Sequence, residues 1–153
     1  MKIVVDSNIV FSAILNTRSN IGQLIINGSS PFDYYSIGLL KEEIINHQSK
    51  IQTISGFSED KFNEIFQLII NKIKFIDDLL ISDKDLNNSF KLVENIDEND
   101  VLFVALANHL RCKLWTGDKR LIAGLRKKSF PRIITTDELL ELFIQKELNK
   151  LNK

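Results

Sequence analysis

The sequence predicts an α/β protein, specifically a three-layer α/β/α sandwich with a central, mostly parallel sheet of four to five strands. Two observations predict this fold. Short runs of β-branched apolar residues, typical of strands buried on both faces, recur along the 153-residue chain. Segments with apolar residues at helical spacing separate these runs, and strands that alternate with helices form a covered parallel sheet. The length indicates one domain, expected at 1–146, with a polar C-terminal tail at 147–153.

The first third of the chain alternates strand and helix. Residues 2–5 are a short β-branched apolar run, expected as a buried strand, and residues 9–15 follow as a short helix. Residues 20–27 have apolar side chains at helical spacing and stop at a glycine, which commonly ends helices. After a short loop, 32–36 is expected as the second strand and 38–48 as a helix.

The middle of the chain contains longer helical patterns. Ser58 is followed by two acids, a favourable helix start, and an apolar stripe at helical spacing then extends the expected helix over 58–73. A short strand is expected within 75–81 and a helix over 85–95. Residues 98–110 are nearly all apolar after their first turn, which predicts a helix packed against the sheet.

The last third repeats the alternation. Residues 113–116 are expected as a buried strand, 118–127 as a helix, and 132–135 as a last short strand. The closing helix is expected over 136–149, with Thr136 as its cap.

Charge and cysteine content limit the possible functions. Lysine and arginine number 20, as do aspartate and glutamate, so a nucleic-acid binder that works by charge alone is disfavoured. A local patch remains possible, because cations are dense after Asp118, although a solvated helix face is their default interpretation. The single cysteine, Cys112, lies in an apolar stretch and is expected as a small core residue in a reducing compartment. With no signal segment and no apolar run near about 18 residues, a cytoplasmic protein without a membrane partner is expected.

Four acidic residues lie at or near the ends of apolar segments. Asp6 closes the first strand, and Asp118 closes the run that begins at Leu114. Asp100 opens an apolar helix, and Glu43 has apolar neighbours on a helix of its own. The carboxyl ends of parallel strands meet at one edge of a sheet, where such folds bind their ligands. The four carboxylates are therefore expected to converge.

Each acid also has a purely structural interpretation, and together they suggest a metal. Asp6 and Asp118 precede helices and can cap them. Asp100 is a favourable anion in a first helical turn, and Glu43 can face solvent. However, clustered carboxylates repel one another unless a cation lies among them, and hard oxygen ligands suit Mg²⁺ or Mn²⁺. The histidines show no spacing of a ligand pair, so the pattern predicts a divalent metal site and phosphoryl chemistry.

The four acidic segments resemble the motifs of PIN-domain nucleases. In order, they are residues 3–8, the helical segment that reaches Glu43, residues 100–107 and residues 114–118. Their order and spacing fit that family, and the resemblance covers essentially the whole chain. The layout is most similar to the bacterial and archaeal branch of toxin–antitoxin toxins.

The resemblance implies a site and an activity. Members of the family bind one or two Mg²⁺ or Mn²⁺ ions and cut RNA phosphodiester bonds, which leaves 5′-phosphate and 3′-hydroxyl ends. The implied catalytic residues and metal ligands are Asp6, Glu43, Asp100 and Asp118, with Asn8 and Thr116 as hydrogen-bonding supports.

Neighbouring acids make two of these positions ambiguous. Glu42 and Glu43 point about 100° apart on a helix, so only one can face the metal. Glu43 is favoured because it directly precedes the apolar pair Ile44-Ile45, as in the motif. Asp97 lies three residues before Asp100, and it is expected as a supporting group or a loop residue.

The expected partners also follow from the resemblance. RNA is the implied substrate, and Lys119 and Arg120 are expected to contact its phosphates. A small antitoxin protein and a homodimer are further expectations. The apolar region 57–76 is where either surface would be sought, although such a stripe is more often core.

Other functions remain open at this stage. The alternatives are a non-catalytic PIN-fold module that binds RNA or protein, and a housekeeping ribonuclease without an antitoxin. A receiver domain is disfavoured because Asp6 lacks an acidic neighbour, and a haloacid-dehalogenase phosphatase because Asn8 replaces the second acid of Asp-x-Asp. The presence of all four acids favours an enzyme.

Overall fold

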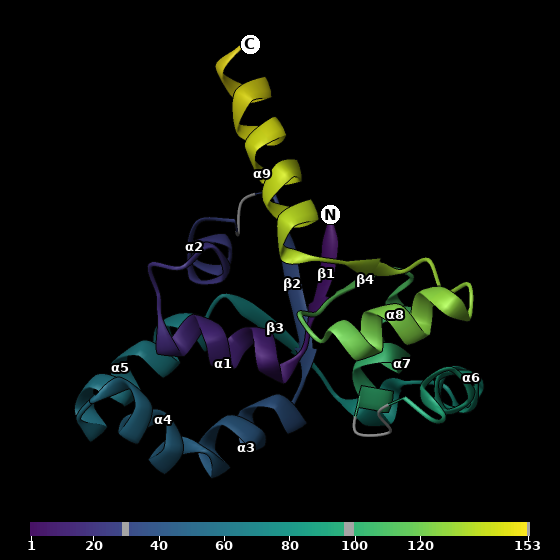
Figure 1. Ribbon diagram of the computed structural model, residues 1–153, viewed down its shortest axis with the longest axis horizontal. Coiled ribbons are helices and arrows are strands. Elements are labelled where there is room, and N and C mark those ends of the chain that lie inside the picture. The colour runs from purple at the N-terminus through teal and green to yellow at the C-terminus, as the bar shows by residue number, and fades with distance from the viewer. Residues whose placement is uncertain (29–30, 97–99, 153) are drawn as a thin grey trace.

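The computed structural model describes residues 1–28, 31–96 and 100–152. Within these residues, five strands form a single parallel sheet in the order β3-β2-β1-β4-β5 (Figure 1). The strands are β1 (Lys2–Val5), β2 (Asp33–Ile37), β3 (Ile73–Ile76), β4 (Lys113–Trp115) and β5 (Ile133–Ile134). Helices cover both faces, so the predicted three-layer α/β/α sandwich is confirmed.

The helices occupy the connections between parallel strands. Such connections are right-handed, so the helices that link β1 to β2 and β2 to β3 cover one face. The helices that link β3 to β4 and β4 to β5 lie on the other face, where α7 packs against β1, β2 and β4, whereas α9 follows β5 and packs against α2 on the first face. The helices are α1 (Ser7–Leu15), α2 (Asn20–Asn27), α3 (Leu39–Asn46), α4 (Gln48–Ser55), α5 (Glu59–Ile70), the 3₁₀ turn η1 (Asp78–Leu80), α6 (Asp83–Val93), α7 (Val101–Leu110), α8 (Lys119–Lys127) and α9 (Thr136–Leu151).

The strand order reverses beside β1. The chain first adds β2 and β3 on one side of β1 and then returns to add β4 and β5 on the other. In the β1–β4 pair, Val5 lies opposite Trp115, so the next residues, Asp6 and Thr116, leave the sheet as neighbours. Open α/β sheets bind their ligands at such a switch point, outside the carboxyl ends of the strands.

The core combines apolar packing with two buried polar side chains that are satisfied. Trp115 is fully buried, and its indole N–H donates to the Thr136 hydroxyl at 3.0 Å, which ties β4 to the start of α9. The Tyr34 hydroxyl donates to the Leu24 carbonyl at 2.5 Å, and its ring lies 5.9 Å from that of Trp115. These bonds fix α2 and α9 against the sheet.

The apolar stripe of α5 is part of the core. Phe62, Ile65, Phe66, Ile69 and Ile70 are buried, and α5 packs against α1 and α4. These five side chains, which belong to the region 57–76 where a dimer or antitoxin surface was sought, are therefore part of this chain's own core.

Several boundaries differ from the sequence-based prediction. Helix α4 was not predicted, because its one buried residue, Ile51, gives almost no apolar periodicity. The expected helix over 58–73 ends at Ile70, and Ile73 begins β3 instead. The strand expected within 75–81 ends at Ile76, since the Asp77 side chain accepts from the Leu79 N–H at 3.0 Å and starts a 3₁₀ turn.

Helix α9 is the last described element. It begins with a capping box between Thr135 and Glu138 and runs to Leu151, so residues 147–151 of the predicted polar tail are helical. Figure 1 shows its C-terminal end projecting away from the sheet. Among the described residues, the helices are too short or too polar to cross a lipid bilayer.

Candidate functional site

Asp6 is a buried carboxylate at the switch point. It follows β1 directly and caps α1, where its Oδ1 accepts from the Ile9 N–H at 3.0 Å. Burial, which leaves the residue 1% exposed, raises the pKa of this carboxyl from 3.8 to about 6. The charge of Asp118 raises this pKa as well, whereas hydrogen bonds from the Thr116 side chain and the backbone N–H groups lower it.

Two oxygen atoms at this point lack a hydrogen-bond partner within the described part of the chain. They are Asp6 Oδ2 and the hydroxyl oxygen of the next residue, Ser7. A buried acceptor without a donor is costly, and a charged one more so. A divalent cation binds oxygen atoms directly, so both atoms are suited to be its ligands.

The neighbouring strand contributes Thr116 and Asp118. The Thr116 hydroxyl is fully buried, and its oxygen accepts from the Asp118 N–H at 3.2 Å. Asp118 caps α8, with Oδ1 accepting from the N–H groups of Arg120 at 3.0 Å and Leu121 at 3.1 Å. Asp118 thus caps a helix and also lies near Asp6. Its role as a cap therefore does not exclude a role in a shared site.

Glu43 lies on α3 beside the start of α1. It lines a hollow of about 250 Å³ that it shares with Ser7 and Asn8. Glu43 is half-buried, whereas Glu42 is exposed and is not among the residues that line this hollow. Of the two neighbouring glutamates, the structure places Glu43 next to the Asp6–Ser7–Asn8 segment.

Asp100 is half-buried and immediately precedes α7. A helix that connects parallel strands runs opposite to them, so its first residues lie at the carboxyl edge of the sheet. Asp100 therefore belongs to the same edge as Asp6 and Asp118. Asp97, expected as a supporting acid, lies outside the described residues.

The four acids do not form a closed cluster. In residues 1–28, 31–96 and 100–152, no three or more His, Cys, Asp or Glu side chains come together as a possible metal-binding group. Asp6 and Asp118 do act on each other, because the charge of Asp118 raises the Asp6 pKa. The predicted four-ligand set remains a prediction.

The hollow beside Glu43 contains residues that the sequence analysis did not single out. His47 and Lys50 line it together with Phe11, and the His47 ring packs edge-on against Phe11 with centroids 5.6 Å apart. Residues 43, 47 and 50 follow helical spacing, so one face of α3 and the start of α4 faces the hollow. That spacing was visible in the sequence, but the missed helix α4 obscured it.

The end of α6 and the following Ile96 are fixed against α8. The Lys128 ammonium donates to the carbonyls of Lys91 at 3.1 Å and Glu94 at 2.9 Å, at the end of α6. A Cβ on Gly124 would lie 2.4 Å from Cδ1 of Ile96, so a larger residue here would require the Ile96 side chain to shift. Lys119 and Arg120, the expected phosphate contacts, are exposed in the first turn of the same helix.

A parallel α/β sandwich with the buried Asp6 and the half-buried Asp118 at its switch point defines a class of proteins that bind ligands at this edge. The chain belongs to a specific family of that class, because the model of the PIN domain family matches residues 4–144. PIN domains are generally nucleases that use divalent metals, which supports a hydrolase acting on nucleic acids. Comparison with curated proteins gave no match.

Proposed function

We propose that the protein is a Mg²⁺- or Mn²⁺-dependent endoribonuclease. The observation that carries the proposal is the state of Asp6. Its carboxyl group is almost completely buried, its pKa is raised to about 6, and its Oδ2 has no hydrogen-bond partner in the described residues. A cation at this oxygen would offset the burial cost that now favours the protonated form.

The donor set fits a hard divalent ion. Asp6 and Asp118 offer carboxylate oxygens at the switch point, and Glu43 within α3 and Asp100 just before α7 offer two more. When bound, such an ion activates a water molecule and stabilises charge that develops on the phosphate. Thr116 orients Asp118 through the backbone, and Asn8 lies on the exposed side next to Glu43.

Cations on both sides of the acids support a nucleic-acid substrate. Lys50 lines the hollow next to Glu43, and Lys119 and Arg120 begin α8 directly after Asp118. Contacts of this type bind phosphates and position the strand without reading its sequence. We place an RNA strand across these cations, with the cut phosphodiester near Asp6, and water attack would leave 5′-phosphate and 3′-hydroxyl ends.

Mn²⁺ titration separates an enzyme from a binding module. An ion that binds only the folded state stabilises it, by about 2.7 kcal/mol at a concentration 100 times the dissociation constant. We expect Mn²⁺ to raise the melting temperature of the wild-type chain and to switch on cleavage of single-stranded RNA. Asp118→Asn keeps an oxygen that can cap α8 and should lose both effects. No melting shift and no cleavage at millimolar Mn²⁺ would favour a non-catalytic PIN-fold module.

We further propose that the protein acts as the toxin of a toxin–antitoxin pair, which rests on the layout of its four motifs. Induced expression should arrest bacterial growth, and Asp118→Asn should not. The product of a short open reading frame adjacent to the gene should restore growth and form a complex with the purified chain. Cleavage without growth arrest would instead favour a housekeeping ribonuclease.

A further inference from the structure

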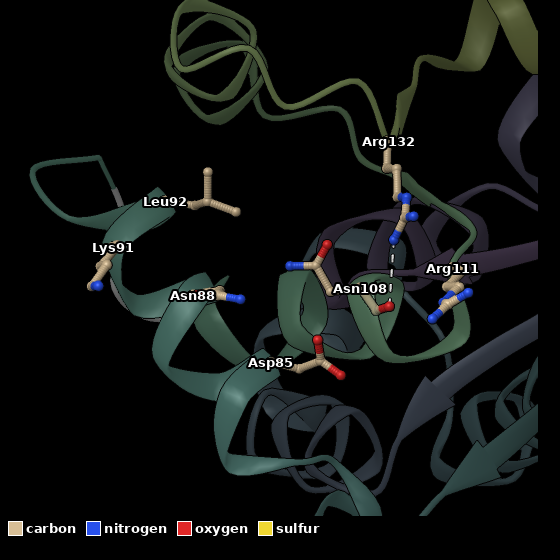
Figure 2. Close-up of a pocket in the computed structure, with 7 residues that line it drawn as sticks. All are labelled: Asp85, Asn88, Lys91, Leu92, Asn108, Arg111 and Arg132. Atoms are coloured by element: carbon tan, nitrogen blue, oxygen red, sulfur yellow. Dashed lines mark hydrogen bonds between the residues drawn. The ribbon is translucent and has the colours of Figure 1, made fainter.

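The opposite edge of the sheet contains a second hollow, which is larger than the one beside Glu43. Its volume is about 510 Å³, and α6, the end of α7 and the residues before β4 and β5 line it (Figure 2). Pockets that enclose small ligands typically measure about 300–1,000 Å³. The hollow lies at the amino ends of the strands, away from the Asp6 edge.

Two arginines form one wall of this hollow. Arg111 comes just before β4 and Arg132 just before β5, and the Leu114 N–H donates to the Arg132 carbonyl at 2.9 Å. The first residues of β4 and β5 are therefore neighbours. Arg132 Nη1 donates to the Asn108 carbonyl at 3.4 Å, as Figure 2 shows. In the described part of the chain neither guanidinium forms an ion pair, and each has five N–H donors.

The number of cations exceeds what the local structure requires. The end of α7 carries roughly half a negative charge, which one arginine can offset. Asp85 also lines the hollow, but its carboxylate accepts from the Ser82 hydroxyl at 3.0 Å and lies 3.6 Å from the His109 ring. A second arginine and Lys91 remain at the rim. This excess indicates an anionic ligand, and guanidinium groups suit phosphate.

The other groups in the hollow are suited to the uncharged part of such a ligand. The Asn88 and Asn108 amides point toward each other across the space, and the Leu92 side chain borders it (Figure 2). The Asn108 amide is oriented by donating to the buried Ser89 hydroxyl at 3.2 Å. Amides offer both donors and acceptors, as base edges require, and a carboxylate such as Asp85 can accept from ribose hydroxyls.

We propose that this hollow binds a ribonucleotide, with its phosphate on Arg111 and Arg132 and its nucleoside against Asn88 and Asn108. The ribonucleotide is either free or part of an RNA strand, since both present the same chemistry. The proposal does not depend on nuclease activity at the Asp6 edge, because the residues of the two sites are separate.

The test is calorimetric titration of the whole chain in EDTA, which prevents metal-dependent cleavage. The probes are adenosine and uridine monophosphates, inorganic phosphate, adenosine, and a short RNA without terminal phosphates. We expect the monophosphates to bind at least about tenfold more tightly than phosphate or adenosine alone, since charged and neutral contacts add. RNA that binds and is displaced by the monophosphate identifies a strand site. Monophosphate binding without RNA binding identifies a free nucleotide.

Three variants locate the binding. Arg111→Asn keeps a residue that tolerates the left-handed backbone at this position, where φ is 53°. This variant and Arg132→Gln should each weaken monophosphate binding by roughly tenfold or more. Lys84→Gln changes an exposed cation of α6 outside the hollow and should bind as the wild type does. If Arg132→Gln does not fold, monophosphate binding by Arg111→Asn is the test of the proposed site.

Three results would overturn the proposal. They are no monophosphate binding at millimolar concentration, equal binding of inorganic phosphate and the monophosphates, and unchanged binding in the folded arginine variants. Asp6→Asn serves as a separate control, because it should abolish cleavage while monophosphate binding in EDTA stays at the wild-type level.

Discussion

The two edges of the sheet carry side chains of opposite charge. The carboxyl edge has Asp6 and Asp118 after neighbouring strands, and the amino edge has Arg111 and Arg132 before neighbouring strands. Helix dipoles account for part of this difference, because connecting helices begin at the first edge and end at the second. This part of the difference would occur in a protein without any ligand.

What distinguishes the edges from ordinary helix capping is what remains unsatisfied. At the carboxyl edge, Asp6 Oδ2 and the Ser7 hydroxyl oxygen lack partners among the described residues. At the amino edge, Arg132 makes one weak hydrogen bond to a carbonyl. Buried groups are normally satisfied, so the exceptions at Asp6 and Ser7 point to a ligand more strongly than the charges alone.

The largest expected effect is the loss of cleavage in Asp6→Asn. Removing groups that only support a metal costs about 10–100-fold, so losing a ligand should cost more than about 100-fold in kcat/KM. Asn keeps an oxygen that can accept from the Ile9 N–H, which preserves the start of α1. The measurement is RNA cleavage in Mn²⁺.

Asp77→Asn is the matched control for this variant. Asp77 also follows a strand and caps the next turn, but it is exposed and lies beyond β3 at the edge of the sheet. It should retain wild-type cleavage. Equal loss in both variants would mean that strand-end aspartates act here only through stability.

The next effect concerns stability and pH in EDTA. Asp6 binds its proton more tightly in the folded chain, with a pKa of about 6 against 3.8. Between these values the folded state binds more protons, so the free energy of unfolding falls as pH rises. Two pKa units correspond to about 3 kcal/mol, so Asp6→Asn should be more stable than wild type by up to about 3 kcal/mol at neutral pH.

Urea unfolding at several pH values measures this difference. The gain of Asp6→Asn over wild type should grow between about pH 4 and pH 7 and then level off. A difference that does not vary with pH would contradict the raised pKa of Asp6, and with it the basis for a cation at this edge.

Thr116→Val should have a smaller effect at the same edge. It removes the hydroxyl that accepts from the Asp118 N–H and lowers the Asp6 pKa. The lost hydrogen bonds should cost about 1–3 kcal/mol, and the apparent Mn²⁺ affinity should fall by about 10–100-fold. Thr116→Ser restores the hydroxyl and should recover both values. If Thr116→Val and Thr116→Ser bind Mn²⁺ with the same affinity, the Thr116 side chain contributes only to packing.

Local patterns made much of the fold and part of the site predictable. Residues 2–5 and 113–115 are short apolar strands in both the prediction and the structure, and both end near an aspartate. The pairing of β1 with β4 is not visible in the sequence, because strands far apart in the chain pair through tertiary packing. The proximity of Asp6 and Asp118 depends on that pairing.

The features that were missed have physical reasons. Helix α4 buries only Ile51, so the amphipathic pattern that reveals a helix is absent, and Lys50 could not be placed beside Glu43. Arg111 and Arg132 are ordinary surface residues in sequence and become a pair only when β4 and β5 align. The sequence therefore indicated the acidic edge, which lies at strand ends, better than the basic hollow, which tertiary packing creates.

The smallest expected effect is the coupling between the two edges. Arg132 lies at the level of Lys113, and Asp6 lies next to Thr116, so about 10 Å of strand separates them along β4. Two intervening strand spacings increase the distance, and changes this far apart usually add within about 0.5 kcal/mol. The unfolding free energy of Asp6→Asn/Arg132→Gln in EDTA should therefore equal the sum of the single changes. A larger coupling would mean that β1, β4 and β5 link the two edges energetically.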